Sequence, residues 1–159
     1  MSTILEALYR GDRTAAEEEA KGRDLDILEA AALGDTARVR ALLADDPTLV
    51  STRSPDGFTA LHYAAFFGTP EAAAALLEHG ADPSAVAENE MQVQPLHSAA
   101  AVDANETARM LLDAGADPNA RQQGGFRPID AAVQNDNEEL RTLLLERGAE
   151  PADTARNQV

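Results

Sequence analysis

Few side chains in this sequence could do acid–base or nucleophilic chemistry. His97 directly precedes Ser98, and a histidine beside a serine could activate a hydroxyl nucleophile. Adjacent residues of a helix point about 100° apart, so the two side chains do not face each other in a helix. The sequence also lacks a Gly-x-Ser-x-Gly turn and a phosphate-cradling glycine loop. We therefore predict no catalytic residue and expect a protein that is not an enzyme.

Metal and cofactor chemistry has equally little support. Cysteine is absent, and the three histidines, His62, His79 and His97, show no His-Glu-x-x-His spacing. The carboxylates Glu138 and Glu139 fall where a helix is expected to begin, and negative charge there favours the positive end of the helix dipole. We expect no metal site and no cofactor.

The sequence contains a repeated pattern, and the histidines and Ser98 lie within it. Leucine pairs recur every 33 to 35 residues, and this period predicts a solenoid of small helical units. In each unit a first helix opens at Thr59, a good N-cap, or at Pro95 or Pro128, where a missing N–H costs nothing. The leucine pairs are Leu42-Leu43, Leu76-Leu77, Leu111-Leu112 and Leu144-Leu145. The second helices that carry them are expected to stop at glycines that take the left-handed conformation, Gly80, Gly115 and Gly148.

These residues resemble the ankyrin repeat. The family pattern is a Gly-x-Thr-Pro-Leu-His turn and helix, an Ala-Ala pair, a glycine between the helices, a Leu-Leu pair and Gly-Ala-Asp. The stretch from Gly57 to Pro83 matches it nearly throughout, with Ala60 in place of proline. Later units depart from the pattern at three positions. Gln92 replaces the turn glycine, Asp103 and Asp136 replace the inter-helix glycine, and Asp130 replaces the histidine. The resemblance implies that His62 and His97 bond to neighbouring turns.

The resemblance implies an all-α solenoid of stacked helix-turn-helix units with short projecting β-turns or hairpins. The start of the chain looks like a shortened copy, with Glu19-Ala20 where a leucine pair is expected, which suits a polar capping unit. We expect a single domain over residues 1–151 that consists of a capping helix pair (1–23) and four repeats (24–52, 53–86, 87–120 and 121–151). A polar tail, 152–159, follows.

Composition limits the classes of partner. The formal net charge of −15 repels phosphate backbones and anionic lipids, so we expect neither nucleic acid nor membrane as a partner. A protein partner with a basic surface is compatible with this charge. No apolar run reaches membrane-spanning length, and we expect a cytoplasmic protein. Lys21 is the only lysine among thirteen basic residues, a bias typical of GC-rich bacterial genomes.

The resemblance implies a protein–protein interaction module that acts as an adaptor, inhibitor or regulatory subunit. It would bind through its concave groove and its turn tips. Aromatic residues fall at groove and turn positions of the repeat, and apolar stripes of this kind mark binding surfaces. We expect the partner-binding residues to be Phe58, Tyr63, Phe66, Phe67, Met91, Val93, Val102 and Phe126, with polar contacts from Arg53 and Arg121.

Several alternatives stay open at this point. Phe58 and Phe126 could pack between turns instead of binding, and one of the consecutive rings of Phe66 and Phe67 should be partly buried. The leucines of the last helix cannot all face the preceding repeat, so an uncapped apolar surface there could drive self-association into a homo-oligomer. The leucines concerned are Leu140, Leu143, Leu144 and Leu145. An enzyme with a dispersed site is a further alternative.

Overall fold

The computed structural model describes residues 1–153, and these residues are helical with connecting turns and loops. No strand occurs among them, although one isolated antiparallel bridge joins Arg53 to Thr59 across a hairpin turn. The last six residues of the expected tail lie outside the described part. The α-helices of residues 1–153 are α1 (Thr3–Tyr9), α2 (Arg13–Ala20), α3 (Ile27–Leu33), α4 (Thr36–Asp45), α5 (Ala60–Phe66), α6 (Pro70–Glu78), α7 (Pro95–Ala101), α8 (Asn105–Asp113), α9 (Pro128–Gln134) and α10 (Glu138–Glu146). Two 3₁₀ turns are η1 (Pro47–Ser51) and η2 (Gln123–Gly125).

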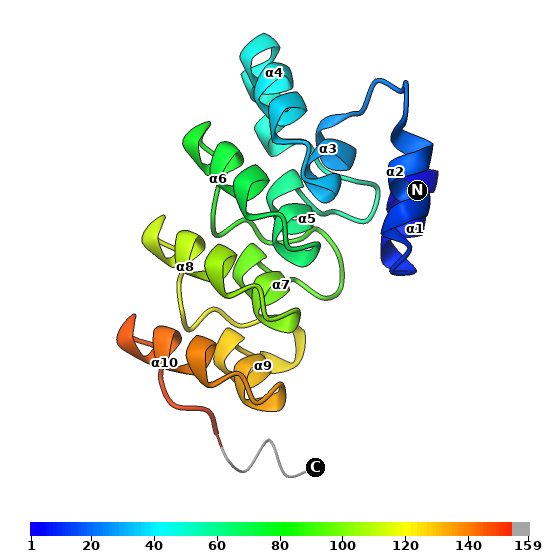
Figure 1. The fold of residues 1–159 in the computed structure, drawn as a ribbon. Helices are drawn as coiled ribbons and strands as arrows, with labels where there is room; N and C mark the ends of the chain where they lie inside the picture. Colours follow the sequence, from blue (N-terminus) through cyan, green and yellow to red (C-terminus); the bar gives the residue numbers. More distant parts are fainter. Residues whose placement is uncertain (154–159) are drawn as a thin grey trace.

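Four helix pairs stack in one direction: α3–α4, α5–α6, α7–α8 and α9–α10 (Figure 1). The first helices of the pairs form one layer, and the second helices form another. Each helix packs against its partner in the pair and against the equivalent helix of the next pair. The predicted all-α solenoid is therefore confirmed.

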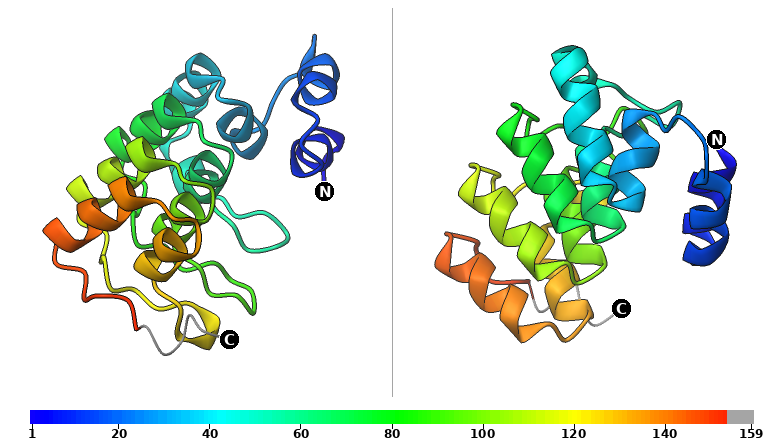
Figure 2. Two further views of the ribbon diagram at one scale, coloured as in Figure 1. Left: turned by 60° about the horizontal axis from the view of Figure 1, so that its bottom comes forward. Right: turned by 45° about the horizontal axis from the view of Figure 1, so that its top comes forward.

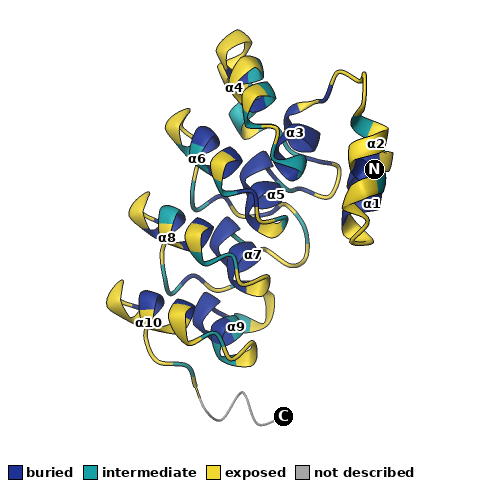
Figure 3. Cartoon of the chain, in the orientation of Figure 1, coloured by how far each residue is buried: buried dark blue, intermediate teal, exposed yellow. Residues whose placement is uncertain are grey.

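The core lies between the two layers and between successive pairs (Figure 3). Ala64 and Ala65 of α5 are fully buried, and so are the equivalent alanines of α3 and α7. Their small side chains leave room for neighbouring first helices to approach closely. In the second helices, Leu76, Leu111 and Leu144 are fully buried. Each unit thus depends on its neighbours to cover its apolar face, as expected for a repeat protein.

The ends of the helices form as the sequence predicted. Thr59 is the N-cap of α5, where its side chain accepts a hydrogen bond from the backbone N–H of His62. Pro95 and Pro128 open α7 and α9 at the first helical positions. The glycine expected after α6, Gly80, has a φ of +87°, which is the left-handed conformation.

Three departures from the repeat pattern share one backbone property. Gln92, Asp103 and Asp136 replace glycines of the pattern, and their φ values are 51°, 57° and 54°. They are the only residues other than glycine with positive φ in the described part of the chain. The stack therefore imposes the left-handed conformation at these positions even where the residue disfavours it.

The N-terminal helix pair does not extend the stack. It lies beside α3, on the side away from α4 (Figures 1 and 2). The buried side of α1 consists of Ile4, Leu5, Ala7 and Leu8, whereas α2 buries only Ala16. The Arg13 guanidinium of α2 donates a hydrogen bond to the Leu33 carbonyl at the end of α3, with an N–O distance of 2.5 Å. The polar α2 agrees with the expected loss of its leucine pair, but its sideways position was not foreseen.

The last helix pair presents little apolar surface. Leu140, Leu143 and Leu144 of α10 are all buried, and only Leu145 is exposed, at 36%. As expected, the four leucines do not all pack inside, but three of them are buried where α10 meets α8 and α9, so the exposed apolar surface of the set is limited to Leu145. The support for self-association through this end is correspondingly weak.

The turn tips are joined in sequence by hydrogen bonds. The Glu88 N–H donates to the Gly57 carbonyl at 3.0 Å, and the Asn89 side-chain amide donates to the Asp56 carbonyl at 2.7 Å. The next tip continues the series, because the Gln123 N–H donates to the Met91 carbonyl at 2.9 Å. A Cβ atom on Gly57 would lie 2.5 Å from the Glu88 carbonyl oxygen, and its φ is +81°. Glycine at this position therefore permits both the turn and the close contact.

We predict that Gly57→Ala destabilises the protein much more than Gly80→Ala. Both glycines have positive φ, but a Cβ on Gly80 would meet no atom within 4 Å. The expected loss in the free energy of unfolding is about 1 kcal/mol for Gly80→Ala and at least about 2 kcal/mol for Gly57→Ala. Urea denaturation of both variants measures the difference, and equal losses would show that the tip contact is not a constraint.

Candidate functional site

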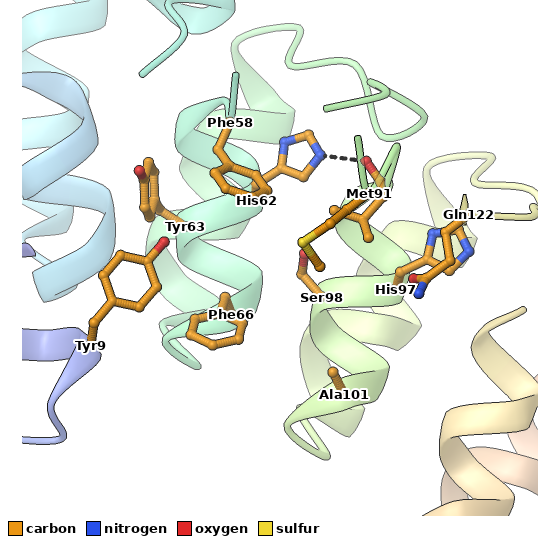
Figure 4. A pocket seen from close by; sticks show the side chains of 11 residues that line it. Tyr9, Phe58, His62, Tyr63, Phe66, Met91, His97, Ser98, Ala101 and Gln122 are labelled. Atoms are coloured by element: carbon orange, nitrogen blue, oxygen red, sulfur yellow. Dashed lines mark hydrogen bonds between the residues drawn. The ribbon is translucent and has the colours of Figure 1, made fainter. Parts of the chain in front are cut away.

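A cavity opens on the face formed by the first helices and the turn tips. Its volume is about 360 Å³. It lies between α5 and α7, under the turn that carries Met91, and Tyr9 of α1 closes one side (Figure 4). The lining residues are Tyr9, Phe58, His62, Tyr63, Phe66, Met91, Val93, His97, Ser98, Ala101 and Gln122.

The hollow arises from a difference between two equivalent helices. Counted from the alanine pairs, Tyr63 and Phe66 of α5 correspond to Ser98 and Ala101 of α7. Large rings thus project from one helix and small side chains from the next, and Figure 4 shows the space that remains. This contrast between large and small residues at equivalent positions was a usable signal in the sequence.

One wall of the cavity is a cluster of aromatic rings. The ring centroid of Tyr9 lies 5.2 Å from that of Phe67, 5.8 Å from that of Phe66 and 6.5 Å from that of Tyr63. Phe66 and Phe67 meet edge to face at 5.1 Å. Such ring pairs contribute about 0.5–1.5 kcal/mol each beyond the burial of area. The cluster fixes the N-terminal helix pair against α5.

The predicted binding residues in the cavity divide into a mouth and a floor. Phe66 is 39% exposed and Met91 is 54% exposed, so both are accessible to a partner. Phe58 is half-buried. Tyr63 and Val93 are only 2% and 5% exposed, and they form the floor.

Three predicted aromatic or aliphatic residues lie outside the cavity. Phe67 is half-buried and stacks behind Tyr63, with ring centroids 6.1 Å apart. Val102 is exposed but does not line the cavity. Phe126 is exposed and lines a separate, more polar hollow with Gln134 and Asn135.

The two predicted arginines hold turns in place. Arg53 donates to the carbonyls of Gly57 and Val86 at 2.9 and 3.0 Å, and it forms an ion pair with Glu88 at 3.1 Å. Arg121 donates to the Gly125 carbonyl at 3.1 Å within its own turn. Both guanidinium groups therefore have structural partners in the described part of the chain.

The sequence-based prediction missed several residues of the cavity. Tyr9 is distant in the sequence and belongs to a helix pair whose position no repeat pattern gives. The histidines were assigned to the packing of turns, and their ring edges nevertheless line the cavity. The missed residues are Tyr9, His62, His97 and Ser98, and Ala101 and Gln122 also line the cavity.

Both cavity histidines connect a first helix to the next turn. In His62, Nδ1 accepts from the Thr59 N–H at 3.2 Å, so the proton is on Nε2, which lies 3.0 Å from the Val93 carbonyl oxygen. His97 repeats the arrangement, with Nδ1 3.0 Å from the Gln94 N–H donor and Nε2 3.0 Å from the Ala120 carbonyl oxygen. The role that the resemblance implied for these histidines is confirmed.

Burial keeps the histidines neutral, although the hydrogen bonds to backbone groups act in the opposite direction and raise their pKa values. Burial lowers the pKa of His62 to about 4, and the charge of Arg53 adds to this effect. Burial also lowers the pKa of His97. Because both nitrogens of His97 are occupied by backbone groups, His97 cannot take a proton from Ser98, and the pair does not form a nucleophile.

The last pair achieves the same connection with different residues. Asp130 takes the histidine position, and its carboxylate accepts the Arg127 N–H at 2.8 Å. The Arg127 side chain, 6% exposed, donates to the carbonyls of Glu150 and Pro151 at 3.4 and 3.0 Å. Arg127 thus supplies the donor that Nε2 supplies in the earlier units.

The remaining chemistry of the described residues is sparse. Residues 1–153 contain no group of three His, Asp or Glu side chains arranged to hold a metal ion. Within the same range, every helix is too short or too polar to cross a membrane.

Comparison with known proteins gives the following matches. A family model described as ankyrin repeats (3 copies) matches residues 7–87 and 27–122. An ankyrin repeat protein of Rickettsia felis is 32% identical over 119 residues, which are 75% of this chain and 39% of that protein. The human NAD-capped RNA hydrolase NUDT12 is 46% identical over 56 residues, and the serine/threonine-protein kinase VIK of Arabidopsis thaliana is 48% identical over 59 residues. These matches cover 35% and 37% of this chain but only 12% and 14% of the two enzymes.

We predict that acid weakens the fold through His62. The pKa of His62 is about 4 in the folded protein and about 6.5 when unfolded, so unfolding takes up a proton between these pH values. The contribution of His62 is complete above pH about 6.5 and declines as the pH falls toward 4, by up to about 3 kcal/mol.

The control for this prediction is His62→Gln. This variant should be less stable at pH 7.5, because the bond to Val93 is weakened, but its stability should depend less on pH between 7 and 5. Urea denaturation at several pH values measures how the free energy of unfolding depends on pH in the original protein and in the variant. The same pH dependence in both proteins would contradict the assignment of the acid effect to His62.

We predict that Tyr9→Ala loosens the N-terminal helix pair. The substitution removes all three ring contacts to α5 and its C-cap residue Phe67. The amides of residues 3–20 should therefore exchange with deuterium faster, while those of α6–α10 keep their protection. Tyr9→Phe keeps the ring and should behave like the original protein. Unchanged exchange in Tyr9→Ala would show that other contacts hold the pair.

Proposed function

The chain belongs to the ankyrin repeat family, and we propose that it recognises a protein partner through the cavity and the turn tips around it. Ankyrin repeats are protein–protein interaction modules. The observation that carries the proposal is the apolar cavity between α5 and α7, with Phe66 and Met91 exposed at its mouth. An apolar hollow with exposed rings beside it is a typical place for an interface hot spot.

The cavity is formed before any partner arrives. Val93 is fixed by the bond from His62, and Met91 accepts a hydrogen bond from the next turn tip. The aromatic cluster fixes Phe66 on the other side. A site that is already ordered loses little conformational entropy on binding, which favours affinity. This rigid complementarity suits an adaptor, an inhibitor or a regulatory subunit acting in the cytoplasm.

The alternatives have less support. The enzyme names of NUDT12 and VIK describe proteins of which this chain spans about one eighth, so their activities give no argument for catalysis here. Ser98 has no base beside it, because His97 is occupied by backbone groups. Self-association through the last pair has a small apolar surface available, since Leu145 is the one exposed leucine of α10.

We predict that Phe66→Ala weakens partner binding by about 2 kcal/mol or more, since an exposed ring beside a cavity is a candidate hot spot. Ala101→Trp should abolish binding by filling the mouth of the cavity. Val102→Ala is the matched control. Val102 is as exposed as Phe66 and directly follows Ala101 in the chain, but it lies outside the cavity. Circular dichroism and urea denaturation establish that each variant is folded.

The measurement is an affinity capture from the lysate of the native host, followed by titration of the captured protein. A partner retained by the original chain and by Val102→Ala, but lost by Phe66→Ala and Ala101→Trp, is the expected result. A partner retained equally by all four proteins would place recognition on another face and overturn the proposal.

A further inference from the structure

We propose that the cavity accepts one uncharged apolar side chain of a peptide segment that carries lysine or arginine next to that residue. The inference rests on the proposed function and specifies the chemistry of the partner. It follows from three features, which are the lining of the cavity, its open side and the charges at its rim.

The lining selects an uncharged side chain. The walls consist mainly of aromatic rings, the Met91 thioether and small aliphatic groups, and their polar groups outside the histidines are the uncharged hydroxyls of Tyr9, Tyr63 and Ser98 and the Gln122 amide. His62 and His97 use both ring nitrogens on backbone groups, so they present no free donor or acceptor. Uncharged hydroxyl and amide groups do not compensate a buried charge, so the lining favours an uncharged side chain.

The open side indicates a side chain on a peptide and not an enclosed small molecule. A volume of about 360 Å³ is near the lower end of ligand sites, which span about 300–1,000 Å³. The mouth residues Phe66 and Met91 are 39% and 54% exposed, and Ala101 is also exposed. The cavity is therefore open on one side, and the rest of a bound peptide can continue from there along the turn tips.

The rim carries uncompensated negative charge. Asp56 and Glu90 belong to the two turn tips whose residues Phe58 and Met91 line the cavity, and neither carboxylate forms an ion pair in the described residues. Glu88 is on the same tip but is neutralised by Arg53. On the α1 side, burial raises the pKa of the Tyr9 hydroxyl above its usual range, and the nearby charge of Asp56 adds to the rise, so Tyr9 contributes no charge.

One cation lies close in the sequence to this rim. Arg10 follows Tyr9 at the end of α1 and is exposed, without an ion pair in the described residues. The two unpaired carboxylates, Asp56 and Glu90, outnumber this cation, and the whole chain carries −15. Lysine or arginine beside the apolar residue would thus meet attraction at the rim and during approach, whereas aspartate or glutamate would meet repulsion.

The test is selection of peptides from a phage-displayed library of random dodecapeptides on the full chain. Selected peptides are then synthesised, and their affinities are measured by fluorescence polarisation. Three variants accompany the original protein: Asp56→Asn with Glu90→Gln neutralises the rim, Ala101→Trp fills the mouth, and Val102→Trp is a control of equal size outside the cavity. Circular dichroism establishes the folding of each.

We expect the selected peptides to share a Phe, Leu, Ile or Met with Lys or Arg within two positions. Binding should persist in Val102→Trp and disappear in Ala101→Trp. The neutral-rim variant should bind about three- to tenfold more weakly at low salt, and the difference should shrink as salt is added.

Three results would overturn the inference. Peptides that lack basic residues and bind the neutral-rim variant equally would remove the charge requirement while the proposed function stands. Peptides that tolerate Ala101→Trp would place recognition elsewhere. Binding of the apolar dye 8-anilinonaphthalene-1-sulfonate, abolished by Ala101→Trp, without selection of any peptide would assign the cavity to a small apolar molecule. The lysate capture described above decides separately whether a protein partner exists.

Discussion

The hydrogen bond from a first helix to the next turn is the interaction on which the architecture depends. His62 makes it to Val93, His97 makes it to Ala120, and Arg127 takes over the donor role in the last unit. Each helix pair is too small to bury its apolar face alone, so its stability comes from its neighbours. These bonds set the position of each turn relative to the helix below it. The same bonds therefore place Val93 at the floor of the cavity and Met91 at its mouth.

The candidate site shows how a repeat protein obtains an individual surface. Equivalent positions of α5 and α7 hold Tyr63 and Phe66 on one helix and Ser98 and Ala101 on the other. The backbone repeats, but the change in side-chain volume leaves a hollow that uniform units would not have. Tyr9 then closes one side, because the N-terminal helix pair lies beside the stack and not at its end. The residues that line the cavity thus come from units that are far apart in the sequence.

The two buried histidines bond to backbone groups and set the geometry of the stack. The neutral histidines have every ring nitrogen bonded to backbone, which compensates their burial and leaves no free base. Negative charge is kept at the exposed turn tips instead, with Asp56 and Glu90 outside the apolar lining. The separation of an uncharged cavity from an acidic rim is the physical basis for the partner chemistry inferred above.

The sequence by itself determined the period, the helix ends and the helical solenoid. Leucine pairs, alanine pairs and glycines act locally or between adjacent units, so a repeating pattern is enough to specify them. The sequence also identified Phe66 and Met91 as groove or tip residues that the structure leaves exposed. Only the tertiary structure decided the sideways position of α1 and α2 and the burial of the α10 leucines. Both depend on side-chain contacts between segments outside the repeat register, such as Tyr9 against Phe67, and a periodic pattern contains no information about contacts of that kind.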